Sequence, residues 1–356
     1  MKKHNYSAGP SILPQEVFEK ASKAVLDFNN SGLSILEISH RSKDFVAVMD
    51  EARALALDLL GLTGKGYQAL FLQGGASTAF LMAPYNLMKE NGKAAYLDSG
   101  TWATAAIKEA KFFGETVIVG SSKEENYNHI PKGYQIPADA DYFHCTSNNT
   151  IFGTQMKEFP TTNIPVVCDM SSDIFSRDLD FSKFDLIYAG AQKNMGPAGT
   201  TLVVVKEEIL GKNGRAIPSM LDYTKHIKAE SMYNTPPVFS VYVSLLTMQW
   251  IKAQGGVAAV EKLNDAKASL LYTEIDRNPL FKGAAAVEDR SNMNVTFLLN
   301  NADHTETFDK LWKEAGVSGL PGHRSVGGYR ASIYNAMPIE SVQVLVDVMK
   351  ALETKV

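Results

Sequence analysis

Lys193 and Asp169 stand where two reactive groups could work together. Lys193 follows the apolar run at residues 186–188 and lies in a glycine-rich turn, and Asp169 directly follows an apolar run at residues 164–168. Such runs predict buried parallel strands, whose carboxyl ends meet at the crevice where α/β proteins bind ligands. Pyridoxal phosphate needs an amine that forms an imine with its aldehyde and a carboxylate that keeps its ring nitrogen protonated. The two residues therefore predict a pyridoxal phosphate site.

The alternative for Lys193 is a solvated loop charge, which is the usual role of a lysine after a strand. Asp169 argues against that alternative because an acid at the end of a buried strand faces the ligand crevice. A free lysine, with a pKa of roughly 10, is protonated at neutral pH. Imine formation and desolvation lower that pKa into a working range.

A second glycine turn could bind a phosphate. The expected strand at residues 69–72 runs into Gln73-Gly-Gly-Ala-Ser-Thr-Ala79, after which the pattern becomes helical. Backbone N–H groups at such a helix start favour an anion, and Ser77 and Thr78 add hydroxyl donors. A plain turn with an N-cap serine is the other interpretation. The P-loop and dinucleotide fingerprints do not occur after a strand, so a single cofactor phosphate fits best.

Composition limits the class of protein. The 356 residues carry 35 lysines and arginines against 39 acids, a net charge of −4, so there is no basic footprint for nucleic acid or an anionic membrane. Cys145 and Cys168 lie in apolar runs, which suits reduced thiols of a cytosolic enzyme, and metal-ligand spacing is absent. With no signal-peptide pattern and no apolar run long enough to span a bilayer, we expect a soluble, cytoplasmic protein that binds small molecules and no metal.

Helical and strand patterns alternate over most of the chain, which predicts an α/β fold with a mostly parallel, seven-stranded sheet. We expect a 1–15 N-terminal arm, a 16–256 large domain that binds the cofactor, and a 257–356 small α+β domain. The arm could pack on the small domain or across a dimer. Helices are expected at residues 16–28, 44–60 and 101–113 and from about 239. Strands are expected at residues 69–72, 94–97, 116–119, 142–145, 166–168, 186–188, 201–205, 294–299 and 330–334.

Seven sequence blocks together closely resemble the phosphoserine aminotransferases, and they cover nearly the whole chain. The blocks are Ser7-Ala-Gly-Pro10, Ser39-His-Arg41, Gln73-Gly-Gly-Ala76, Tyr188-Ala-Gly-Ala-Gln-Lys-Asn194, Asn234-Thr-Pro-Pro237, Gly322-His-Arg324 and Arg330-Ala-Ser-Ile-Tyr-Asn-Ala-Met-Pro338. The resemblance implies a fold-type I, class V pyridoxal-phosphate enzyme that works as a homodimer with active sites at the subunit interface.

The resemblance also implies roles for individual residues around the cofactor. Lys193 would be the Schiff-base lysine and Asp169 the partner of the ring nitrogen. Trp102, otherwise an ordinary core aromatic, would stack on the ring, and Thr150 would steady the polar groups beside it. The cofactor phosphate would be met by Ala76, Ser77 and Gln192 of one subunit and by Asn234 and Thr235 of the other.

Arginine suits a substrate that carries both a phosphate and a carboxylate, because its guanidinium binds paired oxygens. By resemblance Arg330 takes the α-carboxylate. The substrate's phosphate, or the side-chain carboxylate of glutamate, would be surrounded by His40, Arg41, His323 and Arg324. For a single arginine a surface ion pair is the alternative. The chain departs from some family members by having Ser77 where they carry an arginine, so one positive contact to phosphate is missing.

The implied reaction is ping-pong transamination between L-glutamate and 3-phosphohydroxypyruvate, giving 2-oxoglutarate and O-phosphoserine in serine biosynthesis. Some family members also aminate a longer phosphorylated keto acid on the route to pyridoxine.

Several alternatives remain open. An aminotransferase for unphosphorylated keto acids such as glyoxylate would not need two His-Arg pairs. A cysteine desulfurase would need a cysteine on a mobile loop. A non-catalytic protein that binds a cofactor or nucleotide would not need Lys193, and no repeats, heptads or charged tails favour a structural role.

Overall fold

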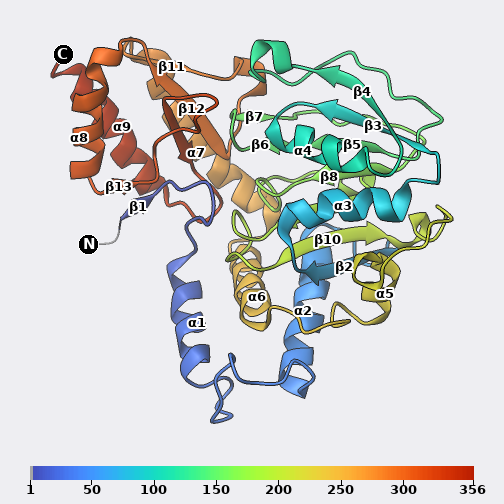
Figure 1. Ribbon diagram of the computed structural model, residues 1–356. Helices are drawn as coiled ribbons and strands as arrows, with labels where there is room; N and C mark the ends of the chain where they lie inside the picture. Colours follow the sequence, from blue (N-terminus) through green and yellow to red (C-terminus); the bar gives the residue numbers. More distant parts are fainter. Residues whose placement is uncertain (1–2) are drawn as a thin grey trace.

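The computed structural model describes residues 3–356, and a seven-stranded sheet forms the centre of the larger part of this region (Figure 1). The neighbours in the sheet are parallel except that β10 runs antiparallel to both β2 and β9. In spatial order the strands are β2 (Tyr67–Leu72), β10 (Thr201–Lys206), β9 (Leu186–Gly190), β8 (Val166–Asp169), β5 (Phe143–Thr146), β3 (Lys93–Asp98) and β4 (Glu115–Ser121). The expected α/β fold with a mostly parallel sheet is confirmed.

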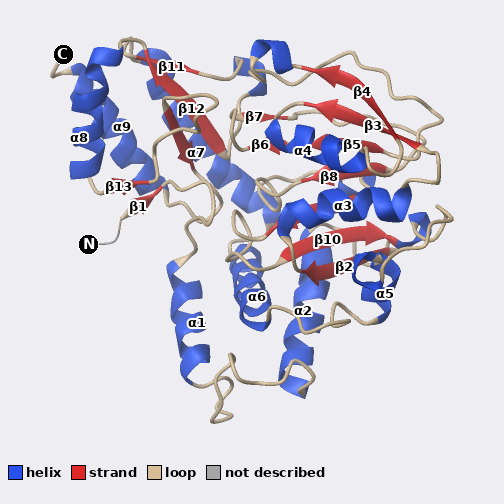
Figure 2. Cartoon of the chain, in the orientation of Figure 1, coloured by secondary structure: helices blue, strands red, loops and turns tan. Residues whose placement is uncertain are grey.

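Helices cover both faces of this sheet (Figure 2). Alternate strand residues enter two different cores, so that Phe71 packs in the same cluster as residues of α2 and α6, and its neighbour Leu70 packs with residues of α3 and α4. Burial on both faces explains why these strands are almost continuously apolar. The helices of this part are α2 (Lys43–Leu59), α3 (Gly75–Leu87), α4 (Thr101–Ala110), α5 (Tyr223–Lys228) and α6 (Val238–Ala253).

The C-terminal part has its own apolar core and a three-stranded antiparallel sheet in the order β11-β12-β14. Its elements are α7 (Val257–Arg277), β11 (Phe281–Gly283), β12 (Asn294–Leu299), α8 (Thr305–Glu314), β13 (Val317–Ser318), β14 (Tyr329–Ser332) and α9 (Ile339–Glu353). Gly255 and Gly256, both with positive φ, separate α6 from α7. We use the names large domain for residues 16–256 and small domain for residues 257–356, and these bounds stay a prediction.

The N-terminal arm packs on the small domain before the chain enters the large one. Strand β1 (His4–Asn5) pairs in parallel with β13, and the Tyr6 hydroxyl donates to the carbonyl of Ser341, 2.5 Å away. Helix α1 (Gln15–Leu26) then packs on α6 through a cluster that contains Val17 and Val243. Residues 1 and 2 of the predicted arm lie outside the described residues.

A short hairpin extends from the carboxyl end of β5 and was not expected from the sequence. It consists of β6 (Asn148–Asn149) and β7 (Thr154–Gln155), which pair antiparallel. Strands of two residues are too short to show a period-two pattern. The hairpin matters because its turn carries Thr150, one of the predicted site residues.

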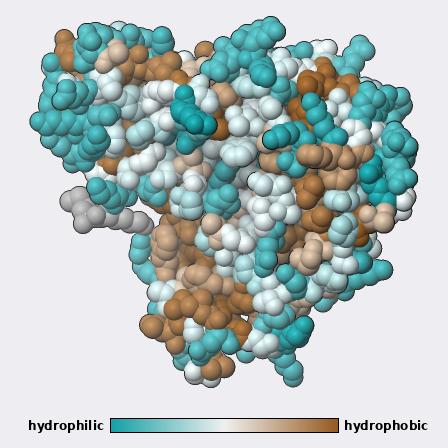
Figure 3. All heavy atoms as spheres, in the orientation of Figure 1, coloured by the Kyte–Doolittle hydropathy of each residue, from teal (hydrophilic) through white to brown (hydrophobic). Residues whose placement is uncertain are grey.

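Apolar side chains gather at the lower end of the molecule in Figure 3, where α1 and the loop after it lie. Leu26 is 82% exposed, and Leu33 and Leu36 in the following loop are also exposed. Contiguous exposed apolar surface of this kind is typical of a protein–protein interface. No helix within residues 3–356 is long and apolar enough to cross a bilayer.

Candidate active site

Lys193 lies in the turn after β9, and its amine is directed toward other predicted site residues. The Nζ atom donates a hydrogen bond to Thr150 Oγ1 at 2.8 Å and lies 6.0 Å from the centre of the Trp102 ring. The pKa of Lys193 is lowered to about 8, chiefly by burial and also by the Arg330 cation, although Asp169 and Asp173 act in the opposite direction. The amine is therefore neutral far more often at physiological pH than an exposed lysine would be.

Asp169 ends β8 and is buried at the same edge of the sheet. It is the direct neighbour of Tyr188 in β9, because the two strands run parallel, and this register brings it close to the turn that carries Lys193. Its Oδ1 accepts a hydrogen bond from the N–H of Ser171 at 2.9 Å. Burial raises the pKa of Asp169, while the Lys193 cation and the Ser171 N–H lower it. A cationic ring nitrogen placed beside this carboxylate would favour its ionised form.

Trp102 is the second residue of α4 and stays 38% exposed, so part of its surface is accessible to a ligand. Gly100, just before the helix, allows this placement, since a Cβ atom there would lie 2.5 Å from Asn149 Oδ1. Helix α4 therefore begins in contact with the β6–β7 hairpin, and Trp102 and Thr150 reach the same site from adjacent elements.

The glycine turn before α3 has the geometry of an anion site. Gly74 and Gly75 have φ values of +100° and +66°, which glycine adopts without strain, and α3 begins at Gly75. The first N–H groups of a helix lack intrahelical partners, and this end of the helix is positive. Ala76 is half-buried and Ser77 exposed in this first turn. The described residues therefore fit a phosphate here.

Gln192 and the loop before α6 lie near the ends of the same strands. The Gln192 side chain folds back over Gly190, where a Cβ atom would lie only 2.7 Å from Gln192 Oε1. Asn234 and Thr235 are exposed, and the Thr235 carbonyl accepts a hydrogen bond from Gln73 Nε2 at 2.9 Å. This contact places the loop beside the start of the glycine turn within one chain. The role of Asn234 and Thr235 at a second subunit stays a prediction.

Arg330 is a basic residue that acts electrostatically on Lys193. It lies on β14, its Nη1 atom donates to the carbonyl of Thr150 at 3.3 Å, and its Nε atom is buried without a hydrogen-bond partner among the described residues. Burial lowers the pKa of Arg330. An enclosed guanidinium with an unused donor is suited to a carboxylate or a phosphate of a substrate.

The two His-Arg pairs differ in how closely they approach this centre. Burial lowers the pKa of half-buried His323, and the cations of Arg330 and Arg324 lower it further, which places these three residues together. His40 has an enclosed Nε2 atom without a partner, and Arg41 is exposed. Among the described residues no hydrogen bond or ion pair joins the first pair to the second. A joint role for all four stays a prediction.

The lysine, the buried carboxylate, the exposed aromatic face and the helix start together match the needs of a pyridoxal phosphate enzyme. A model of the aminotransferase class-V family matches residues 4–345. This chain belongs to the class-V aminotransferases. The family resemblance expected from the sequence blocks is thereby confirmed.

Relatives of this class-V aminotransferase share its full length. The phosphoserine aminotransferase of Flavobacterium johnsoniae is 91% identical over 356 residues and is covered completely, as is this chain. The structure of phosphoserine aminotransferase from Bacillus circulans subsp. alkalophilus is 45% identical, with a TM-score of 0.96 over 99% of each chain. The structure of PLP-bound phosphoserine aminotransferase from Trichomonas vaginalis is 35% identical, with a TM-score of 0.92 over 98% of this chain and 100% of that one.

Three contacts of the turn that carries Lys193 were not expected from the sequence, because they come from the irregular N-terminal arm. The Ser11 hydroxyl donates to the Lys193 carbonyl, and the Ser11 N–H donates to the Gln192 carbonyl at 3.0 Å. Gly9 lies against the lysine stem, where an added Cβ atom would be 3.4 Å from Lys193 Cγ. Gly9-Pro10 and Pro14 make this arm too irregular to place from periodicity, so no sequence pattern indicated which residues it contacts.

Proposed function

We propose that this chain is a phosphoserine aminotransferase. It transfers an amino group between L-glutamate and 3-phosphohydroxypyruvate in two half-reactions, giving 2-oxoglutarate and O-phospho-L-serine for serine biosynthesis. The observation that carries the proposal is that Lys193 and Arg330 meet on one residue, Thr150, through its hydroxyl and its carbonyl. One amino-acid substrate could then reach the reactive amine with its amino group and the guanidinium with its carboxylate. The relative that is 91% identical over the full length bears the same name.

Pyridoxal phosphate is the cofactor, and when bound it supplies a ring that takes up the electron pair released at the substrate α-carbon. Lys193 would hold it through the amine, and Asp169 would keep its ring nitrogen charged. Trp102 would contact the ring, and Thr150 would hydrogen-bond to its polar groups. Burial raises the pKa of Asp169, and a cationic ring nitrogen beside it would lower that pKa.

The start of α3 would hold the cofactor phosphate, through the backbone N–H groups of Ala76 and Ser77 and through Gln192. Asn234 and Thr235 of a second copy complete this site, so the enzyme works as a homodimer. The exposed apolar surface over α1 and its following loop supports such an interface.

Arg330 binds the α-carboxylate of either amino acid, and its buried unused donor supports this role. The distal anion, a phosphate in O-phosphoserine and a carboxylate in glutamate, is bound by His40, Arg41, His323 and Arg324. A phosphate beside His323 would favour the imidazolium form that Arg330 and Arg324 disfavour without it.

Lys193 Nζ also moves the proton. With the cofactor bound, the free Nζ would carry the proton between the substrate α-carbon and the cofactor, away from the α-carbon in the glutamate half-reaction and toward it in the keto-acid half-reaction. Such a base works best with a pKa near the working pH, and the pKa of about 8 at Lys193 satisfies this requirement.

We propose a cytoplasmic location. The cysteine content supports it, because the 356 residues include only Cys145 and Cys168, both buried in strands of the central sheet, and this is no disulfide framework. Use of a longer phosphorylated keto acid on the route to pyridoxine is a further proposal, and it rests on the family resemblance alone.

The test is the absorption spectrum of the purified protein with and without O-phosphoserine. We expect a yellow protein whose visible absorbance bleaches with O-phosphoserine but not with serine. A yellow protein that ignores O-phosphoserine would point to an aminotransferase for unphosphorylated substrates. A colourless protein that added cofactor cannot turn yellow would contradict the proposal as a whole.

A further inference from the structure

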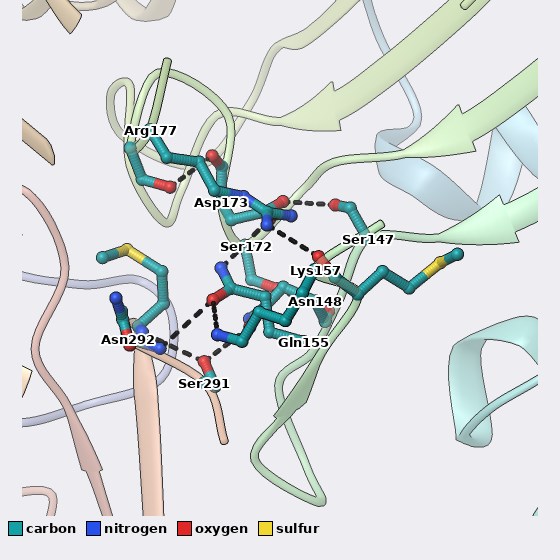
Figure 4. Close-up of polar contacts among 12 residues, drawn as sticks. Ser147, Asn148, Gln155, Lys157, Ser172, Asp173, Arg177, Ser291 and Asn292 are labelled. Carbon is teal, nitrogen blue, oxygen red and sulfur yellow. Dashed lines mark hydrogen bonds and ion pairs between the residues drawn. The ribbon is translucent and has the colours of Figure 1, made fainter. Parts of the chain in front are cut away.

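A buried polar network surrounds Asn148, at the start of the β6–β7 hairpin (Figure 4). The Asn148 side chain is buried and uses both of its polar atoms. Its Nδ2 atom donates to Ser172 Oγ and to Asn294 Oδ1, each at 2.8 Å, and its Oδ1 atom accepts from Ser291 Oγ at 2.5 Å. Ser172 belongs to the large domain, whereas Ser291 and Asn294 belong to the small domain. One side chain therefore joins the two domains.

The tip of the hairpin is seated directly on the small domain. Thr296 of β12 donates its hydroxyl to the carbonyl of Phe152 at 2.9 Å, and the N–H of Ser291 donates to the carbonyl of Gly153 at 2.9 Å. Gly153 has a φ of +75°, and a Cβ atom there would lie 2.4 Å from Thr296 Oγ1. The hairpin thus approaches β12 more closely than a larger residue allows.

The base of the hairpin is fixed to the end of β8, at Asp169, and to the loop that follows it. Ser147 donates its hydroxyl to Asp173 and also lies 3.1 Å from the Asp169 carbonyl. Gln155 Nε2 donates to Asp173 Oδ2 at 3.3 Å, and Arg177 forms an ion pair with the same carboxylate at 2.9 Å. Figure 4 shows Asp173 between Ser147 and Arg177. The hairpin is consequently held at both ends.

The network continues from Asn148 to the strand of Arg330. Asn294 Nδ2 donates to Ser332 Oγ at 3.0 Å, and in the register of β12 and β14 Asn294 faces Ser332 while Thr296 faces Arg330. Asn148 is thus linked through one asparagine to the strand that presents Arg330. In the chain, Asn148 begins the hairpin strand that leads into the turn in which Thr150 contacts Lys193 and Arg330.

We propose that Asn148 is a positioning residue for the amino-acid substrate: through its contact with Asn294 it sets the separation between the Lys193 amine and the Arg330 guanidinium. This inference rests on the proposed function, in which Arg330 binds the α-carboxylate. The substrate amine must reach the place of Lys193 Nζ while the carboxylate meets Arg330. Loss of the Asn148 contact frees the strand of Arg330 to shift against the hairpin, and displacements of about 1 Å have large effects on such geometry.

The test compares Asn148→Ala with Asn264→Ala in the cofactor-loaded enzyme. Asn264 is a matched control, because it is equally buried and also joins the domains, donating to the Ser176 carbonyl at 2.8 Å and to Asn335 Oδ1 at 2.9 Å, away from the hairpin. We expect Asn148→Ala to raise KM for glutamate roughly tenfold. The dissociation constant of the unreactive dicarboxylate maleate, followed by the visible absorbance, rises in parallel. Asn264→Ala loses similar thermal stability but keeps both constants within about twofold.

An unchanged KM and maleate affinity in Asn148→Ala, or equal increases in both variants, overturns the proposal. If Asn148→Ala does not fold, Thr296→Val decides instead, since it removes only the bond to Phe152 and should raise both constants in the same direction but less. The variant Arg330→Lys tests the carboxylate role of Arg330 separately from the positioning role of Asn148. If that variant binds maleate and glutamate normally, the carboxylate role of Arg330 in the proposed function fails, whatever Asn148 does.

Discussion

The amine of Lys193 donates its hydrogen bond to the hydroxyl of Thr150, 2.8 Å away. Because the carbonyl of the same threonine accepts from Arg330, the reactive amine and the half-buried guanidinium are positioned by one residue of a short hairpin. That hairpin is bound to the loop of Asp169 on one side and to β12 on the other. Four sequence segments are thereby brought to a single site, and the arrangement leads to the following expectations.

Lys193→Ala should lower kcat by at least roughly 10²–10⁴-fold, the range expected for removal of a general acid–base group. The variant should also lack the visible band of lysine-bound cofactor. Since the side chain makes no contact that holds the core, the circular dichroism spectrum and the melting temperature should stay close to those of the parent protein. Substantial turnover in this variant would refute the role of the lysine.

The amine of Lys193 should titrate near pH 8 in the cofactor-free protein, because burial lowers its pKa. Asp169→Asn removes a charge that favours the ammonium form, so it should lower this pKa further. Arg330→Gln removes a repelling cation, so it should raise it. The measurement is the pH dependence of reductive methylation at Lys193, followed by mass spectrometry, with exposed Lys310 as the control in the same sample. Opposite shifts would contradict the electrostatic account.

Asp169→Asn should preserve the fold and the hydrogen bond from the Ser171 N–H, since an asparagine oxygen can accept it. It cannot hold the ring nitrogen in its charged form, so kcat should fall by roughly 100-fold or more, while the cofactor still binds. Cofactor affinity and kcat are measured separately on the same preparation. An unchanged kcat would show that the charge of Asp169 is not needed for the reaction.

Lys267→Met should change how stability depends on pH. Lys267 is buried on α7 and donates to the carbonyls of Ile333 and Tyr334 at 2.9 and 2.6 Å, and burial lowers its pKa to about 7. Since a free lysine titrates near 10.4, the unfolded chain binds more protons than the folded protein between pH 7 and about pH 10. Linkage then makes the contribution of Lys267 to the free energy of unfolding increase with pH over that window.

Melting temperatures of the parent protein and of Lys267→Met at pH 7 and pH 9.5 test this expectation. The parent should gain stability relative to the variant at the higher pH. A difference that stays constant, or that moves the other way, would mean that Lys267 keeps an ordinary pKa when folded.

Much of this protein could be predicted from the chain alone. The strands β3, β9 and β10 can be recognised locally in the sequence. Because they are buried on both faces, they appear there as nearly unbroken apolar runs. Lys193 and Asp169 were recognisable because each follows such a run, and parallel strands bring their carboxyl ends to one edge. The glycine turn before α3 was recognisable for a similar reason, since a strand, two glycines and a helical pattern are adjacent in the chain.

Tertiary structure alone decided how these parts meet. The strands of the β6–β7 hairpin are too short to show an alternation of apolar and polar residues. The position of the hairpin depends on contacts of Asn148 and Gly153 with residues of β12, which lie far away in the chain. The contact of Ser11 with Lys193 and the pairing of β1 with β13 also join distant segments. Local patterns report which face of an element is buried, whereas hydrogen bonds between distant segments depend on how the two domains pack. The sequence by itself therefore determined the reactive groups and the sheet, and only packing decided the distance from Lys193 through Thr150 to Arg330.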